Sequence, residues 1–217
     1  TVESNSFSRS AIGHRAFIAT LRKLGMPVEV SRFRTLDRVG DNDLLLLLEP
    51  DAKAGDEILS QLDRVPHVLL VLPKWEGVPD LNRLTWIGQM GLLPESDVEQ
   101  VLHAVLPGAD LGRQKNKLEY DATRYHGRLA IEQPQYIDAA NDVRIGSLLL
   151  ARDGTLLAER TDNGNHLWIL SDPDILSNAG LDEADNGIGA VSIVRSLLPQ
   201  GGKVVIKAGR FGPYVNW

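Results

Sequence analysis

The chain contains no cysteine among its 217 residues. Disulfides, thiolate nucleophiles and cysteine-ligated zinc sites are therefore excluded. Long apolar runs are also absent, because the longest aliphatic stretches, Leu44–Leu48 and Val68–Leu72, fall far short of the roughly 20 apolar residues that a membrane-spanning helix needs. We therefore expect no part of this chain to insert directly into a membrane.

A basic field and the common catalytic signatures are missing as well. Lys and Arg total 23 against 29 Asp and Glu, so the formal net charge is −6 and nucleic acid is not expected as a partner. The sequence has no G-x-S-x-G nucleophile elbow, no glycine-rich phosphate loop, no G-x-G-x-x-G fingerprint and no H-E-x-x-H motif. We predict no cofactor and favour a non-enzymatic role over an enzymatic one.

Strand and helix signals alternate in the first third of the chain. Ser8 and Ser10 can cap a helix that stops at Gly25. Continuous apolar runs that follow are typical of parallel strands covered on both faces, and a strand–helix–strand order predicts a right-handed crossover. The predicted strands are 28–31, 44–48 and 68–72, and the predicted intervening helix is 54–64.

The middle of the chain is less regular, and we predict that residues 79–142 form an insertion or lid over the sheet. Ser96 to Glu99 fits a capping box for a helix through Leu106. Two short segments, 117–121 and 128–132, are predicted to pair as strands.

Two hairpin turns organise the last third. Asp153-Gly154 and Asn163-Gly164 are strong turn signals between apolar segments, so we predict an antiparallel meander that enters the main sheet. A helix from about Asp185 to Leu198 follows, with Asp185 or Asn186 as its cap. A last strand is predicted at 203–206.

Ligands of open α/β sheets bind where a strand's carboxyl end meets a helix N-terminus. The polar loop that follows the predicted strand at residues 167–170 lies at such a position. Its aspartates could hold a hard cation, although their spacing matches no defined ligand frame and helix capping is the commoner use of such residues. Whether a metal binds therefore stays open. The candidate binding residues at this edge are Ser8, Arg9, Ser10, His14, Glu49, Lys74, Ser171, Asp172, Asp174, Asn178, Asp185 and Asn186.

Alternatives accompany these candidates. Arg9 could bind a carboxylate ligand or pair with an acid of the Asp172 loop, and His14 could contribute to a site or be a partly exposed helix residue. Glu49 and Lys74 each follow an apolar strand, so a lysine–carboxylate network beside Asp172 would be either catalytic or a simple ion pair. No residue is predicted to be catalytic.

Several segments in this order give the chain a family likeness across residues 4–206. They are Ser8-Arg9-Ser10-Ala11-Ile12-Gly13-His14, Leu24-Gly25-Met26-Pro27-Val28, Glu49-Pro50, and Leu170-Ser171-Asp172-Pro173-Asp174 with Asn178 and Asp185-Asn186. In these the chain resembles a bacterial family of domains of unknown function, number four-three-five-zero. The resemblance implies a three-layer α/β domain over residues 1–207, with a mostly parallel sheet flanked by helices, of the class I glutamine amidotransferase-like or flavodoxin-like kind. Because those amidotransferases use a nucleophilic cysteine, their activity is not expected here.

The resemblance also implies a cellular context. Members of that family usually carry a transmembrane helix on each side of the domain and are often encoded beside MoxR-type ATPases and von Willebrand A-like proteins. Since the chain starts at Thr1 rather than at a methionine, we expect it to be a fragment whose anchoring segments are missing. A membrane-anchored, extracytoplasmic (periplasmic) domain with those proteins as partners is therefore expected.

Residues 208–217 are similar to a short motif in the C-terminal modules of bacterial topoisomerase I, and we interpret them as a tail foreign to the domain. For the domain itself we predict an interaction or ligand-sensing function within a membrane-associated assembly. The rival prediction is a hydrolase or transferase that uses the Asp172 and Asp174 carboxylates.

Overall fold

Two runs of consecutive aliphatic residues lie at the centre of the molecule, in β2 (Leu44–Leu48) and β3 (His67–Val71). Every residue of β2 is buried, as expected of a parallel strand that is covered on both faces. The two strands pair in parallel, as predicted, and most of the segment that connects them lies outside the described residues. The structure is a computed structural model that describes residues 10–32, 34–50, 59, 61–79, 87–138 and 145–207.

A nine-stranded sheet has the order β1-β13-β2-β3-β12-β11-β9-β6, with β10 added to β11. Neighbours from β1 to β12 in this order are parallel, whereas β12, β11, β10, β9 and β6 pair antiparallel. The remaining strands of this sheet are β1 (Val28–Ser31), β6 (Asp110–Arg113), β9 (Gln135–Asp138), β10 (Ile145–Ala151), β11 (Gly154–Asp162), β12 (Asn165–Leu170) and β13 (Val204–Lys207). The predicted combination of a parallel sheet and a C-terminal meander is thus present in one mixed sheet.

The meander follows from its turn residues. Asn163 and Gly164 have φ values of 49° and 85°, the left-handed pair that a two-residue type I′ turn requires. Residues 155–159 and 167–170 then pair antiparallel within β11 and β12, and β12 continues into the parallel half through β3. The hairpin prediction is confirmed.

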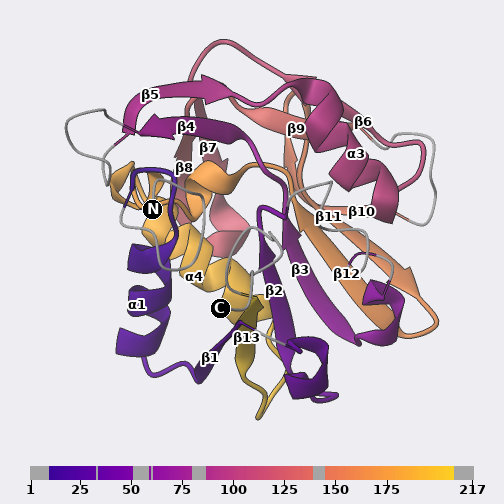
Figure 1. The fold of residues 1–217 in the computed structure, drawn as a ribbon. Helices are drawn as coiled ribbons and strands as arrows, with labels where there is room; N and C mark the ends of the chain where they lie inside the picture. The colour runs from indigo at the N-terminus through magenta and orange to yellow at the C-terminus, as the bar shows by residue number, and fades with distance from the viewer. Residues whose placement is uncertain are drawn as a thin grey trace, which may run out of the picture.

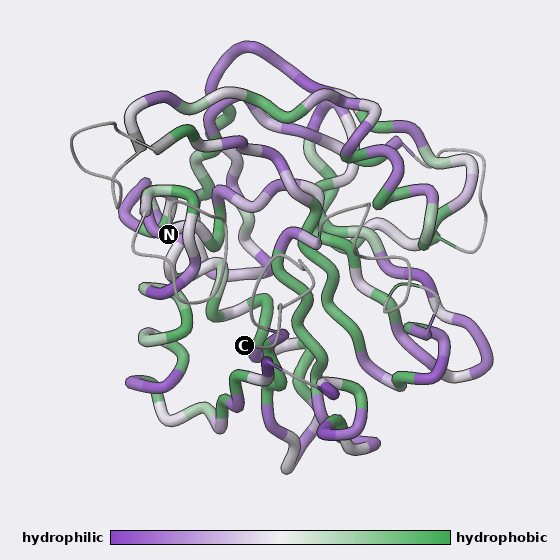
Figure 2. The backbone as a smooth tube through the Cα atoms, in the orientation of Figure 1, coloured by the Kyte–Doolittle hydropathy of each residue, from purple (hydrophilic) through white to green (hydrophobic). Residues whose placement is uncertain are grey.

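Helices cover both faces of the sheet, which gives three layers (Figure 1). Alternate residues of β2 face opposite sides, so Leu44, Leu46 and Leu48 join one core and Leu45 and Leu47 the other. Figure 2 shows these central strands as the most hydrophobic part of the chain. The first core includes α1 (Arg15–Lys23) and α4 (Asn186–Leu197), and the second includes α3 (Glu95–Val105). No helix in the described segments is long and apolar enough to cross a membrane.

The starts of α1 and α3 differ from the predictions. α1 begins at Arg15 with His14 at its N-cap, and no side chain of the N-cap bonds the helix, so Ser10 is not the cap. α3 begins at Glu95 after Pro94, one residue before the predicted capping box, and that box does not form. Proline fixes φ near the value that a helix start needs, which allows the earlier start. Most of the predicted helix 54–64 lies outside the described residues, and Leu62–Arg64 forms a 3-10 turn.

Two small hairpins lie outside the main sheet. β4 (Trp75–Pro79) pairs with β5 (Ile87–Leu92), and β7 (Leu118–Ala122) pairs with β8 (Gly127–Ile131), the latter as predicted. The chain enters β4 directly from the carboxyl end of β3, so the β4–β5 hairpin lies over this edge of the sheet (Figure 1). The described part of segment 79–142 also contributes α3 and two strands of the main sheet, β6 and β9.

Candidate functional site

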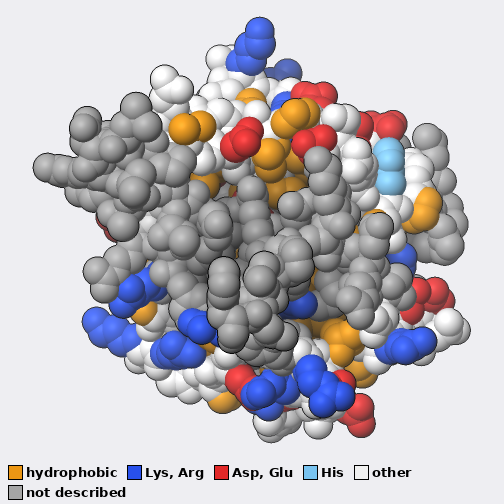
Figure 3. All heavy atoms as spheres, viewed as in Figure 1, with side chains coloured by type: hydrophobic (Ala, Val, Ile, Leu, Met, Phe, Trp, Pro, Cys, Tyr) orange, Lys and Arg blue, Asp and Glu red, His pale blue; other side chains and the backbone are white. Residues whose placement is uncertain are grey.

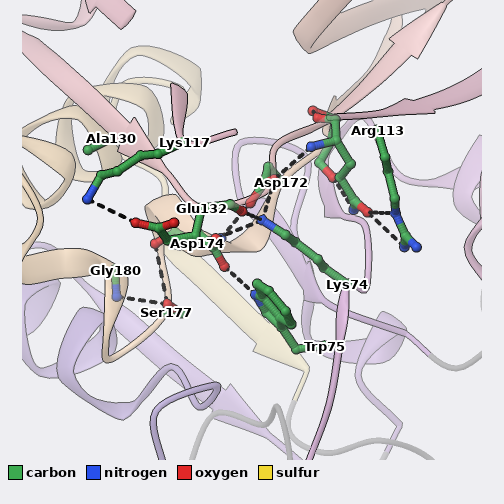
Figure 4. A network of polar contacts seen from close by, with 12 residues as sticks. Lys74, Trp75, Arg113, Lys117, Ala130, Glu132, Asp172, Asp174, Ser177 and Gly180 are labelled. Atoms are coloured by element: carbon green, nitrogen blue, oxygen red, sulfur yellow. Dashed lines mark hydrogen bonds and ion pairs between the residues drawn. The ribbon is translucent and has the colours of Figure 1, made fainter. Parts of the chain in front are cut away.

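Three of the predicted candidates meet beyond the carboxyl ends of β3 and β12. Lys74 follows β3, and the Asp172 and Asp174 carboxylates follow β12 (Figure 4). The Lys74 Nζ atom lies 2.8 Å from Asp172 Oδ2 and 2.7 Å from Asp174 Oδ2. The Lys74 and Asp172 side chains are fully buried, and that of Asp174 is 11% exposed. We call these three residues the Lys74 cluster.

The Lys74 cluster is densely hydrogen-bonded. The third Nζ donor of Lys74 goes to the Glu132 carbonyl, so all three N–H groups of the ammonium are used. Asp172 accepts from the backbone N–H groups of Gln135 and Asp174, each at 3.0 Å, in addition to Lys74. Buried charges are tolerated when paired and hydrogen-bonded in this way. The ammonium therefore has no donor left for a ligand.

Gln135 and Arg113 extend the Lys74 cluster, and sequence reasoning missed both. The Gln135 side-chain amide donates to the carbonyls of Pro73 and Ser171, and its oxygen accepts from Arg113 Nε and Nη2 at 3.3 and 3.2 Å (Figure 4). The Ser171 hydroxyl donates to the Gln135 carbonyl. Burial lowers the pKa of Arg113, with nearby carboxylates opposing it. No motif surrounds Gln135, so no sequence signal could have found it.

Burial also perturbs Asp172 strongly. Desolvation by burial, together with the nearby charge of Asp174, raises the pKa of Asp172 to about 7 against the opposing effect of Lys74. A carboxyl group with such a pKa can exchange a proton near neutrality. Because Asp172 is fully buried, it has no route for direct contact with a ligand.

A pocket of about 120 Å³ opens next to Asp174, and we call it the edge pocket. Trp75 contributes one wall and donates from Nε1 to Asp174 Oδ1 at 2.6 Å, while Met90 of β5 contributes another. Figure 3 shows one face of the molecule, on which acidic and apolar side chains lie next to one another near the top. The described residues that line the edge pocket are Ala11, Ile12, Trp75, Met90, Ala130, Glu132, Asp174, Ala179, Gly180 and Glu183.

Among the described residues, every ionisable one that lines the edge pocket is an acid. Glu132 and Glu183 pair with Lys117 at 3.1 and 2.7 Å, and Asp174 pairs with Lys74, but neither lysine lines the pocket. Gly180 lets the loop close tightly here, because a Cβ at that position would lie 1.6 Å from the Asp174 carbonyl oxygen. The pocket therefore combines apolar walls with carboxylates whose counterions lie behind them.

His14 and Glu49 form a second buried pair, so His14 is not the partly exposed helix residue of the plainer prediction. His14 Nε2 lies 2.7 Å from Glu49 Oε1, and its Nδ1 lies 3.2 Å from the Leu176 carbonyl. Because a carbonyl only accepts, Nδ1 carries a hydrogen, and the Nε2–Oε1 contact needs one further shared proton. Glu49 also has a left-handed φ of 47°, and its Oε2 has no partner within the segments that the structure describes.

The segment before α1 lies against residues 178 and 179 of the loop after β12. The Asn178 side chain donates to the Ser10 carbonyl at 2.7 Å and accepts from the Ala16 backbone N–H at 2.8 Å. Backbone N–H groups of residues 178 and 179 donate to the carbonyls of Gly13 and Ala11. Asn178 thus binds the first turn of α1 from a distant loop. Ser8 and Arg9 lie outside the described residues, and so does the predicted Arg9 contact.

Asp185 and Asn186 mark the start of α4 but do not cap it through their side chains. Asp185 Oδ2 accepts from the Arg128 backbone N–H at 3.0 Å. The Asn186 amide accepts from Ala130 N and donates to the carbonyls of Ala130 and Gly180. Both side chains therefore fix α4 to β8 by pairing backbone groups of that strand. Among the described residues, no group of three or more acids and histidines could hold a metal ion.

Comparison with known proteins gives a family but no activity. No curated protein matches the chain. Residues 6–188 match the family described as "Domain of unknown function (DUF4350)". The matched range covers most of the sequence and includes the Lys74 cluster and the residues named above as lining the edge pocket. The chain therefore belongs to the DUF4350 family.

Proposed function

We propose that this protein is a non-enzymatic ligand-sensing domain whose binding site is the edge pocket. The observation that carries the proposal is the Asp174 carboxylate, which lines an apolar pocket while Lys74 and Trp75 hold it in place. Small-molecule sites are typically apolar concavities with a few well-fixed polar groups, at the carboxyl edge of an α/β sheet. This pocket has that composition and that place.

A hydrolase or transferase that uses Asp172 and Asp174 is the second candidate. The observation in its favour is the Asp172 pKa of about 7, which suits a general acid or base. Against it, Asp172 is fully buried and both its oxygens already accept hydrogen bonds. A general acid must reach the substrate directly or through one water, so the burial favours a binding role.

The cellular setting is a separate part of the proposal and rests on the family alone. We propose that the domain belongs to a membrane-anchored, extracytoplasmic protein and acts with MoxR-type ATPases and von Willebrand A-like proteins. The amidotransferase-like version of the α/β fold is proposed on the same ground. Fractionation of the full-length protein tests the anchoring, and its recovery in the cytosolic fraction would contradict this part.

A protein-observed NMR screen tests the binding function. Fragment mixtures with neutral, cationic and anionic members are added to ¹⁵N-labelled protein, and we expect shifts of the backbone amides of Trp75, Ala130 and Gly180. Ala179→Leu narrows the edge pocket from an exposed position and should abolish these shifts. Ala19→Leu, on the exposed side of α1, is the matched control and should retain them. Identical shifts in the Ala179→Leu variant, or no shifts at all, would contradict the proposal.

A further inference from the structure

We propose that the edge pocket selects an alkylammonium group, an aliphatic chain that ends in a primary ammonium. This inference rests on the proposed function and names the ligand class of the same site. It follows from the charge of the lining, from the unused acceptors of Asp174 and from the apolar walls.

The charge of the lining favours a cation. Asp174, Glu132 and Glu183 line the edge pocket, whereas Lys74 and Lys117 contact these carboxylates from outside it. A group that enters the pocket therefore meets acidic oxygens before it meets either ammonium. In a partly desolvated site, such an arrangement attracts a cation and repels an anion.

The hydrogen-bonding capacity of Asp174 selects a donor. A carboxylate offers about four acceptor sites, and Asp174 uses one per oxygen, for Trp75 Nε1 and Lys74 Nζ. The remaining sites belong to a side chain that is 11% exposed at the pocket. An ammonium has three N–H donors, so it can bind Asp174 and still reach Glu132 or Glu183. A charge-assisted bond of this kind is stronger than the bond from a neutral hydroxyl.

The walls and the volume select the rest of the ligand. Ile12, Trp75, Met90 and small residues line the edge pocket, and its volume of about 120 Å³ is somewhat below that of a cavity, about 150 Å³, that can hold benzene. Such a space takes a short aliphatic chain and no large ring system. Met90 is 49% exposed, and its flexible thioether can adapt to chains of different length.

Two sources can supply this chemistry, a free small amine or a lysine side chain of a protein. n-Butylammonium represents the first and Nα-acetyl-lysine-methylamide the second. Both place an ammonium at the end of a four-carbon chain, so they share the proposed recognition. Tighter binding of one than of the other identifies the source, and either result supports the class.

The experiment compares isosteric probes by NMR titration of the intact chain. We expect n-butylammonium to bind at least about tenfold more tightly than 1-butanol, and butyrate not to bind at the same concentrations. Asp174→Asn should remove that preference, whereas Asp182→Asn, an exposed acid of the same loop that does not line the edge pocket, should retain it. Because Asp174 also belongs to the Lys74 cluster, Glu183→Gln is a second variant at an exposed position and should weaken n-butylammonium binding severalfold.

The outcomes separate the ligand class from the proposed function. Equal affinities for the ammonium and the alcohol, or a preference for butyrate, would overturn the ammonium class and leave the edge pocket as a binding site. No binding by any of the probes would also overturn the class. The binding function itself is then tested separately, by the fragment screen of the wild type and the Ala179→Leu variant.

Discussion

At the residue scale, the Lys74 cluster contains two ion pairs whose lysine is fully buried. Breaking a buried ion pair by removing one partner leaves an uncompensated charge, which typically costs about 3–5 kcal/mol. We therefore expect Lys74→Met, which keeps the length of the side chain, to lower the free energy of unfolding by about that amount. Urea denaturation measures it, with Lys115→Met at an exposed position as the control. Equal stabilities of the two variants would show that the cluster adds nothing.

The His14–Glu49 pair gives a second prediction, because its partners determine where its protons are. A glutamine amide at position 49 can donate to a neutral His14 Nε2, so Glu49→Gln should change the free energy of unfolding by less than about 1 kcal/mol. Glu49→Ala leaves Nε2 buried without a partner and should cost about 1–3 kcal/mol more. Thermal and chemical denaturation compare the two. If Glu49→Gln lowers the free energy of unfolding as much as Glu49→Ala does, the pair needs the carboxylate at position 49.

The same residues show how far the sequence predicts a site. Strand ends and polar loops predicted that Lys74 and Asp172 share one edge of the sheet, although they lie 98 residues apart. The exposure of His14 and the roles of Gln135 and Arg113 could not be predicted, since they depend on side-chain partners that only the folded sheet brings together. Trp75 is buried, and its indole borders the edge pocket.

At the element scale, the contact between α4 and β8 replaces the expected helix cap. Asn186 is fully buried, and its side chain makes three hydrogen bonds to Ala130 and Gly180, whereas the Asp185 side chain accepts one from Arg128 N. We expect Asn186→Ala to cost about 2–4 kcal/mol and Asp185→Ala about 1 kcal/mol. Hydrogen exchange of the Arg128 amide should accelerate in Asp185→Ala, and that of the Ala130 amide should accelerate in Asn186→Ala. A larger cost for Asp185→Ala would restore the capping interpretation.

Element prediction succeeded where local chemistry is decisive and was wrong where distant contacts decide. Asn163-Gly164 supplies both left-handed residues of its turn, so the meander could be predicted from two positions. The start of α1 depends on Asn178, which binds Ala16 N from 162 residues away, and no local pattern near Ser10 carries that information. The early start of α3 has a local cause instead, because Pro94 fixes φ near the value that a helix start needs.

At the scale of the whole molecule, the apolar strands β2 and β3 determine the three layers, because residues buried on both faces need helices on both sides. The extension of the sheet through β9 and β6 was not predictable, since β9 joins β11 and β6 through backbone pairing that leaves no pattern in the sequence. That extension matters for the site. It brings Gln135, the first residue of β9, against Asp172.

The buried position of Asp172 at this junction links proton binding to the stability of the whole fold. Its pKa is about 7 in the folded state and near 3.8 in the unfolded state, so between these values the native protein binds a proton that the unfolded chain does not. The contribution of this group to stability is therefore complete below pH about 4 and is lost as the pH rises through about 7. Asp172→Asn cannot titrate, so the wild type should lose stability relative to this variant, by on the order of 1–3 kcal/mol, between pH 5 and pH 8.

Urea denaturation of both proteins across that range measures the difference, and the carboxyl ¹³C shift of Asp172 reports its titration directly. The comparison with the variant is needed because other acids change stability in the opposite direction; the pKa of Glu29, for example, is lowered by its hydrogen bonds to Lys203 and Arg38. A stability difference that does not change with pH would mean that Lys74, Gln135 and the Asp174 amide keep Asp172 ionised throughout. In that case the Lys74 cluster would be a permanent ion network, and ligand binding in the edge pocket would be independent of the protonation of Asp172.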